Sequence, residues 1–479
     1  MKKFLSKFSK LSLSFICIDI ILIGIFLFNV IKLNVLPVKY LIILIGVILL
    51  LLLLIILFTQ KRSRKAFKVF GVIFSVIILA LAIIGTYFTG ALNNFLSKFN
   101  SSNTVTYTET FYVLAKNDKY NDINEIKDTT IGYFNNISDI DLAINKLKET
   151  ITFEEKEYDN IFDSFNDVKK EKISGSIVEK NLYDALKEVT EELKGDTYKV
   201  LYSYDIEVQK EVTKKEVNGD YVNIYIGGRD FAFNHDFNMI VTINKKTHKI
   251  LLTSIPRDFY VYVPKFGMKE LLGYASPGAD PSNSIGALEN LFETDINYFV
   301  EIKTDNFVDI VDVVGGVEFC SDKSFTTTHA LILNSYDDTK GQKLRVEKGC
   351  KTYKGIEILT IARERLAYPD GDRQRQKNCQ AIIINLFKKM TSLGSLANFS
   401  NVLDKVSNLY TTNVPQDLVT EIAKSAIDGN SWTFEQQSVT GADSRGFVHR
   451  GTVEDYVMQP NQDSVSAAKA KMKGIMYES

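Results

Sequence analysis

The 479-residue chain has a formal net charge of −1, but its charges are unevenly divided. Residues 1–100 hold 12 of the 57 basic side chains and one of the 58 acidic ones, Asp19, so the rest of the chain is acidic by 12 charges. A basic first fifth followed by an acidic remainder argues against a nucleic-acid-binding protein, whose folded domain carries the positive charge. The length is sufficient for two or more domains, each with its own core.

Three long apolar runs lie in the basic N-terminal part. Residues 11–31, 41–58 and 67–90 are each close to the about 20 residues with which a helix crosses a bilayer. Lysines precede the first run and residues 61–68 add five basic side chains after the second, so the positive-inside rule places both segments in the cytoplasm. A cleaved signal peptide would explain only the first run. The sequence therefore predicts a multi-pass anchor in the cell membrane within residues 1–91, with the large C-terminal part outside the cytoplasm.

Residues 92–218 alternate between strand and helix patterns and show no catalytic motif. This alternation predicts a small α/β accessory domain, whose role would be to bind a partner. The predicted strands are 105–114, 130–133 and 198–204, and the predicted helices are 139–150, 155–165 and 176–193.

Residues 219–479 contain apolar strands separated by amphipathic helices. Such a pattern predicts a three-layer α/β/α domain with a mixed sheet. Residues 244–248 form a polar turn that is short enough for a hairpin. The predicted strands are 221–226, 238–243, 249–255 and 434–439, and the predicted helices are 283–292, 305–313, 355–363, 374–393, 415–427 and 463–476.

Several common active-site patterns are missing from the sequence. The chain has four histidines and no HExxH motif or CxxC pair, so a zinc site is not expected. It also has no GxSxG elbow and no phosphate-binding GxxxxGK[ST] loop. The chemistry must therefore come from arginine, lysine and carboxylate side chains. Cys320 and Cys350 would form a disulfide in an oxidising compartment, with two unpaired structural cysteines as the alternative.

Two carboxylates lie at the ends of neighbouring predicted strands. Asp230 follows the first strand of the domain and Asp236 precedes the second, so the two would meet at one edge of the sheet. Hard oxygen ligands with open positions suit a Mg²⁺ ion that also binds a substrate phosphate. The alternative is an ordinary surface turn rich in glycine and aspartate.

Arginines are concentrated in RERLAYPDGDRQR, residues 363–375. The planar guanidinium group matches a pair of phosphate oxygens, so several arginines together predict a pyrophosphate site. The alternative is a loop of solvated ion pairs, worth about 1 kcal/mol or less each. Arg363 and Arg365 can converge on one ligand only if the helix ends there, as Pro369 and Gly371 permit. The predicted pyrophosphate-binding set is Arg257, Lys269, Arg363, Arg365 and Arg375.

Three long motifs carry a family resemblance: LLTSIPRD at 251–258, INYFVEI to VVGGVEF within 296–319, and RERLAYPDGDRQRQKNCQ at 363–380. With them, residues 219–479 resemble the LytR-CpsA-Psr family of cell-envelope enzymes, in its capsule-type branch with a three-span anchor and an accessory domain. The resemblance implies a Mg²⁺-dependent phosphotransferase. Such an enzyme moves a capsular or teichoic-acid-like glycopolymer from a polyprenyl-pyrophosphate carrier to a peptidoglycan hydroxyl, forming a phosphodiester. A pyrophosphatase side activity would follow if water replaced the hydroxyl.

The resemblance also implies roles for individual residues. It implies that Asp230 and Asp236 bind Mg²⁺, and that residues 381–387 line an apolar tunnel for the prenyl chain, although core packing explains that run equally well. Asn234 and Cys379 depart from the family pattern, which has an arginine and a phosphate-binding glutamine there. The implied phosphate-binding and catalytic residues are Arg257, Arg363, Arg365 and Arg375, with Gln380 as a further ligand and Asp370 and Asp372 as candidate general bases.

The expected partners are the lipid-linked glycopolymer, the peptidoglycan acceptor, the bilayer and membrane proteins of capsule synthesis. Nucleic acid is excluded, because the predicted topology puts the arginines outside the cell. One alternative function remains open at this point: a non-catalytic regulator or assembly partner that binds the lipid-linked polymer and the capsule machinery.

Overall fold

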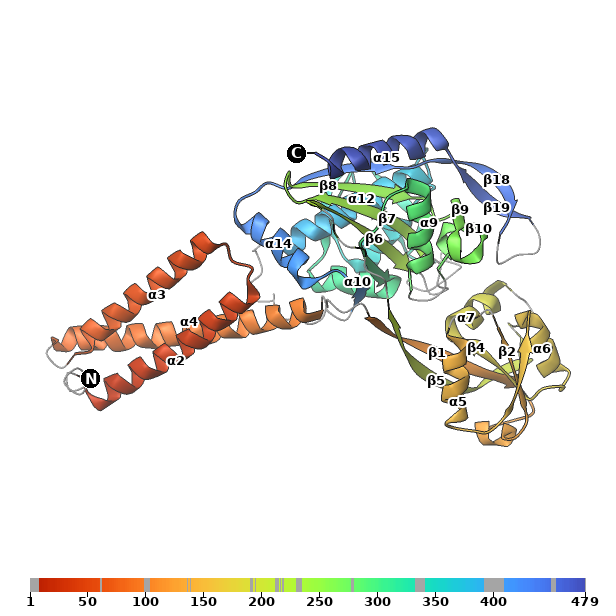
Figure 1. The fold of residues 1–479 in the computed structure, drawn as a ribbon, viewed down its shortest axis with the longest axis horizontal. Coiled ribbons are helices and arrows are strands. Elements are labelled where there is room, and N and C mark those ends of the chain that lie inside the picture. Colours follow the sequence, from red (N-terminus) through yellow and green to blue (C-terminus); the bar gives the residue numbers. More distant parts are fainter. Residues whose placement is uncertain are drawn as a thin grey trace. The chain divides into compact units, whose positions relative to one another are not determined.

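The computed structural model describes residues 8–478 except 61–62, 99–103, 136, 138, 190–192, 194, 212–214, 216, 218, 230–234, 277–279, 332–340, 392–408 and 449–453 (Figure 1). The chain divides into two compact units, which are described separately. One unit comprises residues 1–101, 388–408 and 414–433, and the other comprises residues 102–387, 409–413 and 434–479.

The first unit contains three long apolar helices, α2 (Lys10–Leu33), α3 (Val38–Phe58) and α4 (Lys65–Lys98). All three are long and apolar enough to cross a membrane, and they confirm the three predicted apolar spans as helices. Asp19 of α2 is buried and accepts a hydrogen bond from Ser75 of α4, at 2.5 Å. The unit also includes α14 (Gln416–Ile427).

The second unit begins with a five-stranded sheet in the order β3-β2-β4-β1-β5. Helix α5 packs on one face, where Ala143 and Leu147 meet Phe111 and Ile177. Helices α6 and α7 pack on the other face. The elements are β1 (Thr104–Lys116), a 3-10 turn (Ile123–Ile126), β2 (Thr130–Phe134), α5 (Ile140–Lys148), β3 (Glu154–Tyr158), α6 (Ile161–Lys169), β4 (Gly175–Glu179), α7 (Lys180–Val189) and β5 (Tyr198–Glu211).

Two of the predicted helices in this region are wrong at their beginnings. The first four residues of the segment 155–165 belong to strand β3, and the segment 176–193 begins with β4. Strand β3 is an exposed edge strand, EEKEY, whose charged side chains look helical although pairing with β2 determines its structure. Strand β4 is buried on both faces, so it lacks the alternation by which a strand is recognised.

The second sheet of this unit has the order β16-β11-β6-β7-β8-β17. Strands β6, β7 and β8 form an antiparallel meander, β11 is parallel to β6, and β16 is antiparallel to β11. The sheet is therefore mixed, as predicted. Its strands are β6 (Tyr221–Arg229), β7 (His235–Asn244), β8 (Lys249–Ile255), β11 (Tyr298–Lys303), β16 (Tyr410–Thr412) and β17 (Thr433–Ser438).

Helices cover both faces of this sheet, so the three-layer prediction is confirmed (Figure 1). On one face, α9 (Ser282–Phe292) and α15 (Gln462–Met476) form a core with Tyr225 and Leu251. On the other face lie α10 (Thr304–Val313), α11 (Gly355–Arg363) and α12 (Asp372–Thr391).

Short two-stranded ribbons complete the domain. Cys320 and Cys350 lie opposite each other in one of them and are joined by a disulfide. The ribbons and their connecting turns are β9 (Tyr260–Val263) with β10 (Met268–Leu271), β12 (Val317–Ser321) with β15 (Gly349–Tyr353), β13 (Phe325–Ala330) with β14 (Lys343–Val346), β18 (Gly441–Phe447) with β19 (Glu454–Pro460), and the 3-10 turns Pro264–Phe266 and Leu272–Tyr274.

Candidate active site

The site is built where β6 ends and β7 begins. Gly228 of β6 pairs with Phe237 of β7, but the next residue, Arg229, pairs with His235. Asp236 is therefore an extra residue on β7 with no partner on β6, which makes it the centre of a β-bulge. A bulge redirects the side chain of the extra residue, and here it directs Asp236 toward the guanidinium groups at the end of the sheet.

Asp236 connects two of the predicted arginines. Its carboxylate oxygen Oδ1 forms an ion pair with Nη1 of Arg257, which follows strand β8. Its main-chain carbonyl accepts a hydrogen bond from Nη1 of Arg375 on α12, at 3.3 Å. Burial by itself would lower the pKa of Arg257, but the carboxylates of Asp236 and Asp258 outweigh burial and raise that pKa. Arg257 is thus held as a fixed positive charge beside the bulge.

Helix α11 ends at Arg363, as the convergence of Arg363 and Arg365 on one ligand would require, although only Arg363 lines the cavity described below. The next residue, Glu364, has an extended backbone and a buried carboxylate. That carboxylate accepts hydrogen bonds from the main-chain N–H groups of Thr328 on β13 and of Ala367, the latter at 2.9 Å. These hydrogen bonds hold the end of α11 in place, and the guanidinium group of Arg363 has no hydrogen bond or ion pair to any residue that the structure describes.

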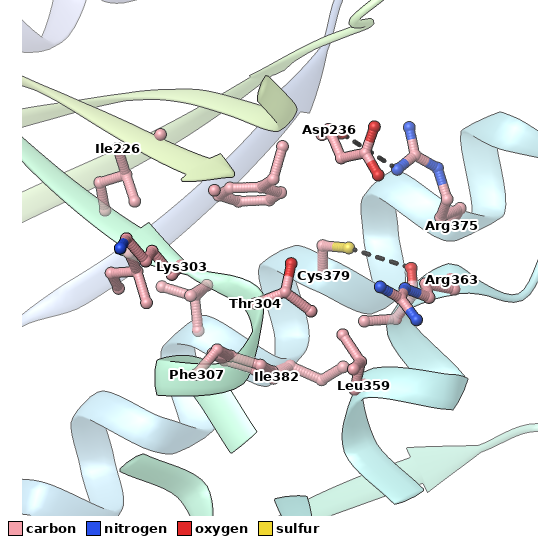
Figure 2. Close-up of a pocket in the computed structure, with 16 residues that line it drawn as sticks. Ile226, Asp236, Lys303, Thr304, Phe307, Leu359, Arg363, Arg375, Cys379 and Ile382 are labelled. Atoms are coloured by element: carbon pink, nitrogen blue, oxygen red, sulfur yellow. Dashed lines mark hydrogen bonds between the residues drawn. The ribbon is translucent and has the colours of Figure 1, made fainter. Parts of the chain in front are cut away.

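A cavity of about 110 Å³ opens between the sheet and helices α10, α11 and α12. Asp236, Arg363 and Arg375 gather toward one end, whereas Ile226, Phe307 and Ile382 line the part away from them (Figure 2). Its other lining residues are Gly227, Gly228, Phe237, Ile302, Lys303, Thr304, Leu359, Ala362, Cys379 and Ile383. Lys303 is labelled beside Ile226, on the side away from the arginines (Figure 2). A site with guanidinium groups at one end and apolar side chains next to them can accept an amphiphile that has an anionic head and a hydrocarbon tail.

One face of α12 supplies both parts of this cavity. Arg375, Cys379, Ile382 and Ile383 all line it, at the spacing i, i+4, i+7 and i+8 of a single helical stripe. Two residues of the predicted tunnel segment 381–387 thus contact the cavity, and Cys379 is the residue between its charged and apolar parts. The thiol of Cys379 donates a hydrogen bond to the carbonyl of Ala362 at 3.4 Å.

Gln380 lies off this stripe, and the structure places it away from the cavity. Its buried amide donates hydrogen bonds to the main-chain carbonyls of Leu252, at 3.3 Å, and Gln437, at 2.7 Å. The amide therefore ties α12 to the region of β8 and β17, and the predicted contact with phosphate is not what the structure shows. The sequence contains a signal for this position, because Gln380 follows Arg375 by five residues and a helix turns such a residue away from the face of Arg375.

Three of the predicted cations, Arg257, Lys269 and Arg365, are not part of the cavity wall. Lys269 is exposed on β10, with its ammonium group 4.9 Å from the centre of the Tyr260 ring. Arg365 is half-buried in the turn after α11, where its carbonyl accepts a hydrogen bond from the N–H of Tyr368. Arg257 and Arg375 both contact Asp236, Arg363 lines the same cavity as Asp236 and Arg375, and Lys269 and Arg365 take part in neither group.

The predicted carboxylates are placed unevenly. Asp370 is exposed in the turn before α12, and Asp372 is the first residue of that helix, with a side chain outside the described part. Asp230, the other predicted metal ligand, and Asn234 lie outside the described residues. Of the two predicted metal ligands, the described part therefore contains Asp236 alone.

That carboxylate fits a hard divalent cation. The side chain of Asp236 is 35% exposed, so it can coordinate an ion through oxygen without being withdrawn from its ion pair. Mg²⁺ prefers one or two such carboxylates and takes its other ligands from water and substrate phosphates. Among the described residues, the one group of three candidate metal ligands is Glu318, Cys320 and Cys350 on the surface, and its sulfur atoms are already joined in the disulfide.

Two buried acids of the site were missed by the sequence analysis. Glu364 stands between Arg363 and Arg365, and a charged residue in so charged a segment gives no sign that it will be buried. Glu301 is enclosed in the strand YFVEIK, where a charged residue in an apolar run was the available signal. Both carboxylates are buried, and both hold elements that carry cavity residues.

The chain is similar to several known proteins. The polyisoprenyl-teichoic acid–peptidoglycan teichoic acid transferase TagU of Bacillus anthracis is 29% identical over 264 residues, which cover 53% of this chain and 79% of the relative. The protein of the same description from Enterococcus faecalis is 28% identical over 224 residues, covering 47% and 68%. The crystal structure of B. subtilis TagV has 21% identity and a TM-score of 0.44, covering 55% of this chain and all of that one. Residues 178–474, more than half of the chain, match the model of the LytR_cpsA_psr family, so the chain belongs to that family.

Proposed function

We propose that this protein is a membrane-anchored phosphotransferase that attaches a polyprenyl-pyrophosphate-linked glycopolymer to peptidoglycan through a phosphodiester. The observation that carries the proposal is the cavity, in which Arg363 and Arg375 adjoin an apolar interior. The relatives named as polyisoprenyl-teichoic acid–peptidoglycan transferases support the choice of donor and acceptor. A capsular or a teichoic-acid-like polymer would serve equally, because the cavity contacts only the carrier end.

The donor would bind with its pyrophosphate at the charged end and its first isoprene units in the apolar part. Arg257, Arg363 and Arg375 supply three guanidinium groups, which is enough to bind several oxygens of a pyrophosphate. Each methylene of the prenyl chain that enters the cavity contributes about 0.8 kcal/mol. The apolar wall of Ile382 and Ile383 thus provides affinity that does not depend on the polymer.

In the proposed reaction, a hydroxyl oxygen of peptidoglycan attacks the phosphorus atom that carries the glycopolymer. A new P–O bond forms to the acceptor, the P–O bond to the other phosphate breaks, and polyprenyl phosphate leaves with the bridging oxygen. The hydroxyl proton passes to a base, for which Asp370 and Asp372 remain the candidates. The arginines stabilise the negative charge that shifts onto the leaving phosphate, since phosphoryl transfer depends mainly on positioning and charge stabilisation.

Mg²⁺ would be held by Asp230 and Asp236, and when bound it would neutralise charge on the pyrophosphate. This can be tested without turnover. Mg²⁺ should raise the melting temperature of the full-length protein in detergent by a few degrees, and Asp236→Asn should abolish the increase. Asp443→Asn, which changes an exposed acid of strand β18, is the matched control and should keep it. An equal increase in both variants would contradict metal binding at Asp236.

The anchor would place the site on the outer surface of the membrane. Basic residues at the N-terminus and between the second and third spans assign those segments to the cytoplasm. After three spans, the remaining chain lies outside, where the peptidoglycan acceptor is. Cysteine labelling with a membrane-impermeant reagent at an exposed position such as Tyr262→Cys tests this orientation in intact cells.

The function is tested with the full-length protein in detergent, Mg²⁺, a polyprenyl-pyrophosphate-linked oligosaccharide and a short peptidoglycan oligosaccharide. The wild type should release polyprenyl phosphate and form the linked product, and Arg257→Ala should lose both. Equal rates with the wild type and this variant would contradict the proposal. Donor binding without turnover would instead favour a non-catalytic assembly partner.

A further inference from the structure

A buried acid and a buried histidine face each other across the strand that ends at the site. Glu301 lies on β11 and His235 on β7, and β6 runs between these two strands. Nε2 of His235 is 3.1 Å from both carboxylate oxygens of Glu301. Nε of Arg229 lies 3.7 Å from Glu301 Oε2. An enclosed carboxylate is costly unless it is paired, so these contacts account for its presence inside the domain.

The contact across β6 requires a glycine at position 227. A Cβ atom built on Gly227 would lie 2.0 Å from Oε1 of Glu301 and 2.9 Å from a ring carbon of Tyr225. No side-chain atom can approach another so closely, and the carboxylate therefore occupies the space that a side chain of β6 would fill. Gly227 is needed here to let Glu301 reach His235.

His235 is one of the two residues that define the bulge. It pairs with Arg229, and the extra residue Asp236 follows it directly. Its carbonyl accepts a hydrogen bond from Nδ2 of Asn238 at 2.8 Å, and Oδ1 of Asn238 accepts one from the hydroxyl of Tyr225 at 2.7 Å. His235 is thus held at its ring by Glu301 and at its main chain by Asn238. These contacts on the ring and on the carbonyl of His235 restrict rotation of the peptide group that joins His235 to Asp236.

We propose that Glu301 is a positioning residue of the active site. By holding His235 across Gly227, it fixes the bulge and keeps Asp236 aimed at Arg257 and at Arg375. Glu301 itself touches neither the donor nor the metal in this account. The inference rests on the proposed function, since it assigns Glu301 to the same site, but the direction of Asp236 can be measured without any reaction.

The test uses the full-length protein in detergent with Glu301→Leu and Glu301→Gln. Leucine cannot accept a hydrogen bond, so Glu301→Leu should raise the Mg²⁺ concentration for half-maximal transfer at least tenfold. It should also weaken the binding of geranylgeranyl pyrophosphate at least tenfold. Glutamine keeps an acceptor oxygen for His235, and this variant should stay within about threefold of the wild type. If Glu301 had only a structural role, both substitutions would destabilise the fold, and Glu301→Gln would not restore the Mg²⁺ requirement and the donor affinity.

Asn244→Ala is the matched control. Asn244 is buried at the end of strand β7 opposite His235, and its amide donates hydrogen bonds to the carbonyls of Ile475 and Glu478. This variant should lower the melting temperature while keeping the wild-type Mg²⁺ requirement and donor affinity. If Glu301→Leu fails to fold, Gly227→Ala tests the same contact from the middle strand, because the added methyl group displaces Glu301.

Three results would overturn the inference. The first is a Glu301→Leu protein with wild-type Mg²⁺ requirement and donor affinity, and the second is an Asn244→Ala control with the same losses. The third is a crystal structure of Glu301→Leu in which Asp236 still contacts Arg257. A wild type that neither binds nor converts the donor would instead contradict the proposed function, and the crystal structure would still test the positioning.

Discussion

Replacing Arg363 by alanine should weaken the binding of a prenyl pyrophosphate, whereas replacing Arg373 should leave it unchanged. The two arginines belong to the same 13-residue segment and carry the same charge. Arg363 ends α11 and lines the cavity beside Arg375, but Arg373 is exposed in the first turn of α12 and is not part of the wall. The pair therefore separates local charge from contact with the ligand.

The expected size of the effect follows from the surroundings of Arg363. Its guanidinium group has no hydrogen bond or ion pair to a described residue, so its donors are available to the phosphate oxygens. A hydrogen bond to a charged group contributes about 1.5–3 kcal/mol, which corresponds to a roughly 10- to 150-fold weaker Kd for Arg363→Ala. Because no internal partner is lost, the free energy of unfolding should change by about 0.5 kcal/mol or less.

Isothermal titration calorimetry of the full-length protein with geranylgeranyl pyrophosphate measures the affinity, and thermal unfolding measures the stability. We expect a large loss of affinity for Arg363→Ala and wild-type affinity for Arg373→Ala. Equal affinities of both variants and the wild type would refute it. An equally large loss for Arg373→Ala would refute it too, because a general effect of charge would then explain the binding.

Three more predictions concern the cavity, the disulfide and pH. Ala362→Trp should lower the affinity for geranylgeranyl pyrophosphate more than tenfold, because the indole ring fills part of the about 110 Å³ cavity; unchanged affinity would mean that the chain binds elsewhere. Removing the disulfide by Cys320→Ser with Cys350→Ser opens a closed loop with a sequence separation of 30. It should cost about 3–4 kcal/mol, or roughly 6–15 °C in Tm by calorimetry, and a wild type unaffected by reducing agent would contradict this. Hydrogen bonding, first of all from Lys156, lowers the pKa of Asp167 to about 2. The stability this adds should be complete above about pH 4 and lost as the pH falls to about 2, and urea unfolding of Asp167→Asn should lack that step.

Much of the domain formed by residues 219–479 could be predicted, because the pattern of apolar and polar residues within each segment is enough to indicate its helix or strand. Helix α11 was expected at residues 355–363 and is found there, since an amphipathic pattern begins after Lys354 and stops before the extended Glu364. The hairpin of β7 and β8 followed from two apolar runs joined by the polar turn at residues 244–248. Strand β4 could not be separated from α7 in the same way, because burial on both faces removes the alternation that marks a strand.

The site was predictable in its residue types but not in its geometry. The clustering of Arg257, Arg363 and Arg375 was expected from their chemistry, and the structure brings all three to one end of the sheet. The bulge at Asp236 depends on a contact between Glu301 and His235, which are 66 positions apart. Local sequence patterns do not reveal a contact between residues so far apart in the chain. The contact that orients Asp236 could therefore be found only from the structure.

The most direct test of the central claim follows the phosphate atom that carries the glycopolymer. The donor is prepared with ³²P at that position and incubated with the full-length protein, Mg²⁺ and peptidoglycan. A phosphotransferase predicts that the label becomes covalently attached to peptidoglycan while unlabelled polyprenyl phosphate is released, and that Arg257→Ala abolishes both. Label that remains with the donor, or that appears only on a free glycopolymer phosphate, would contradict the account.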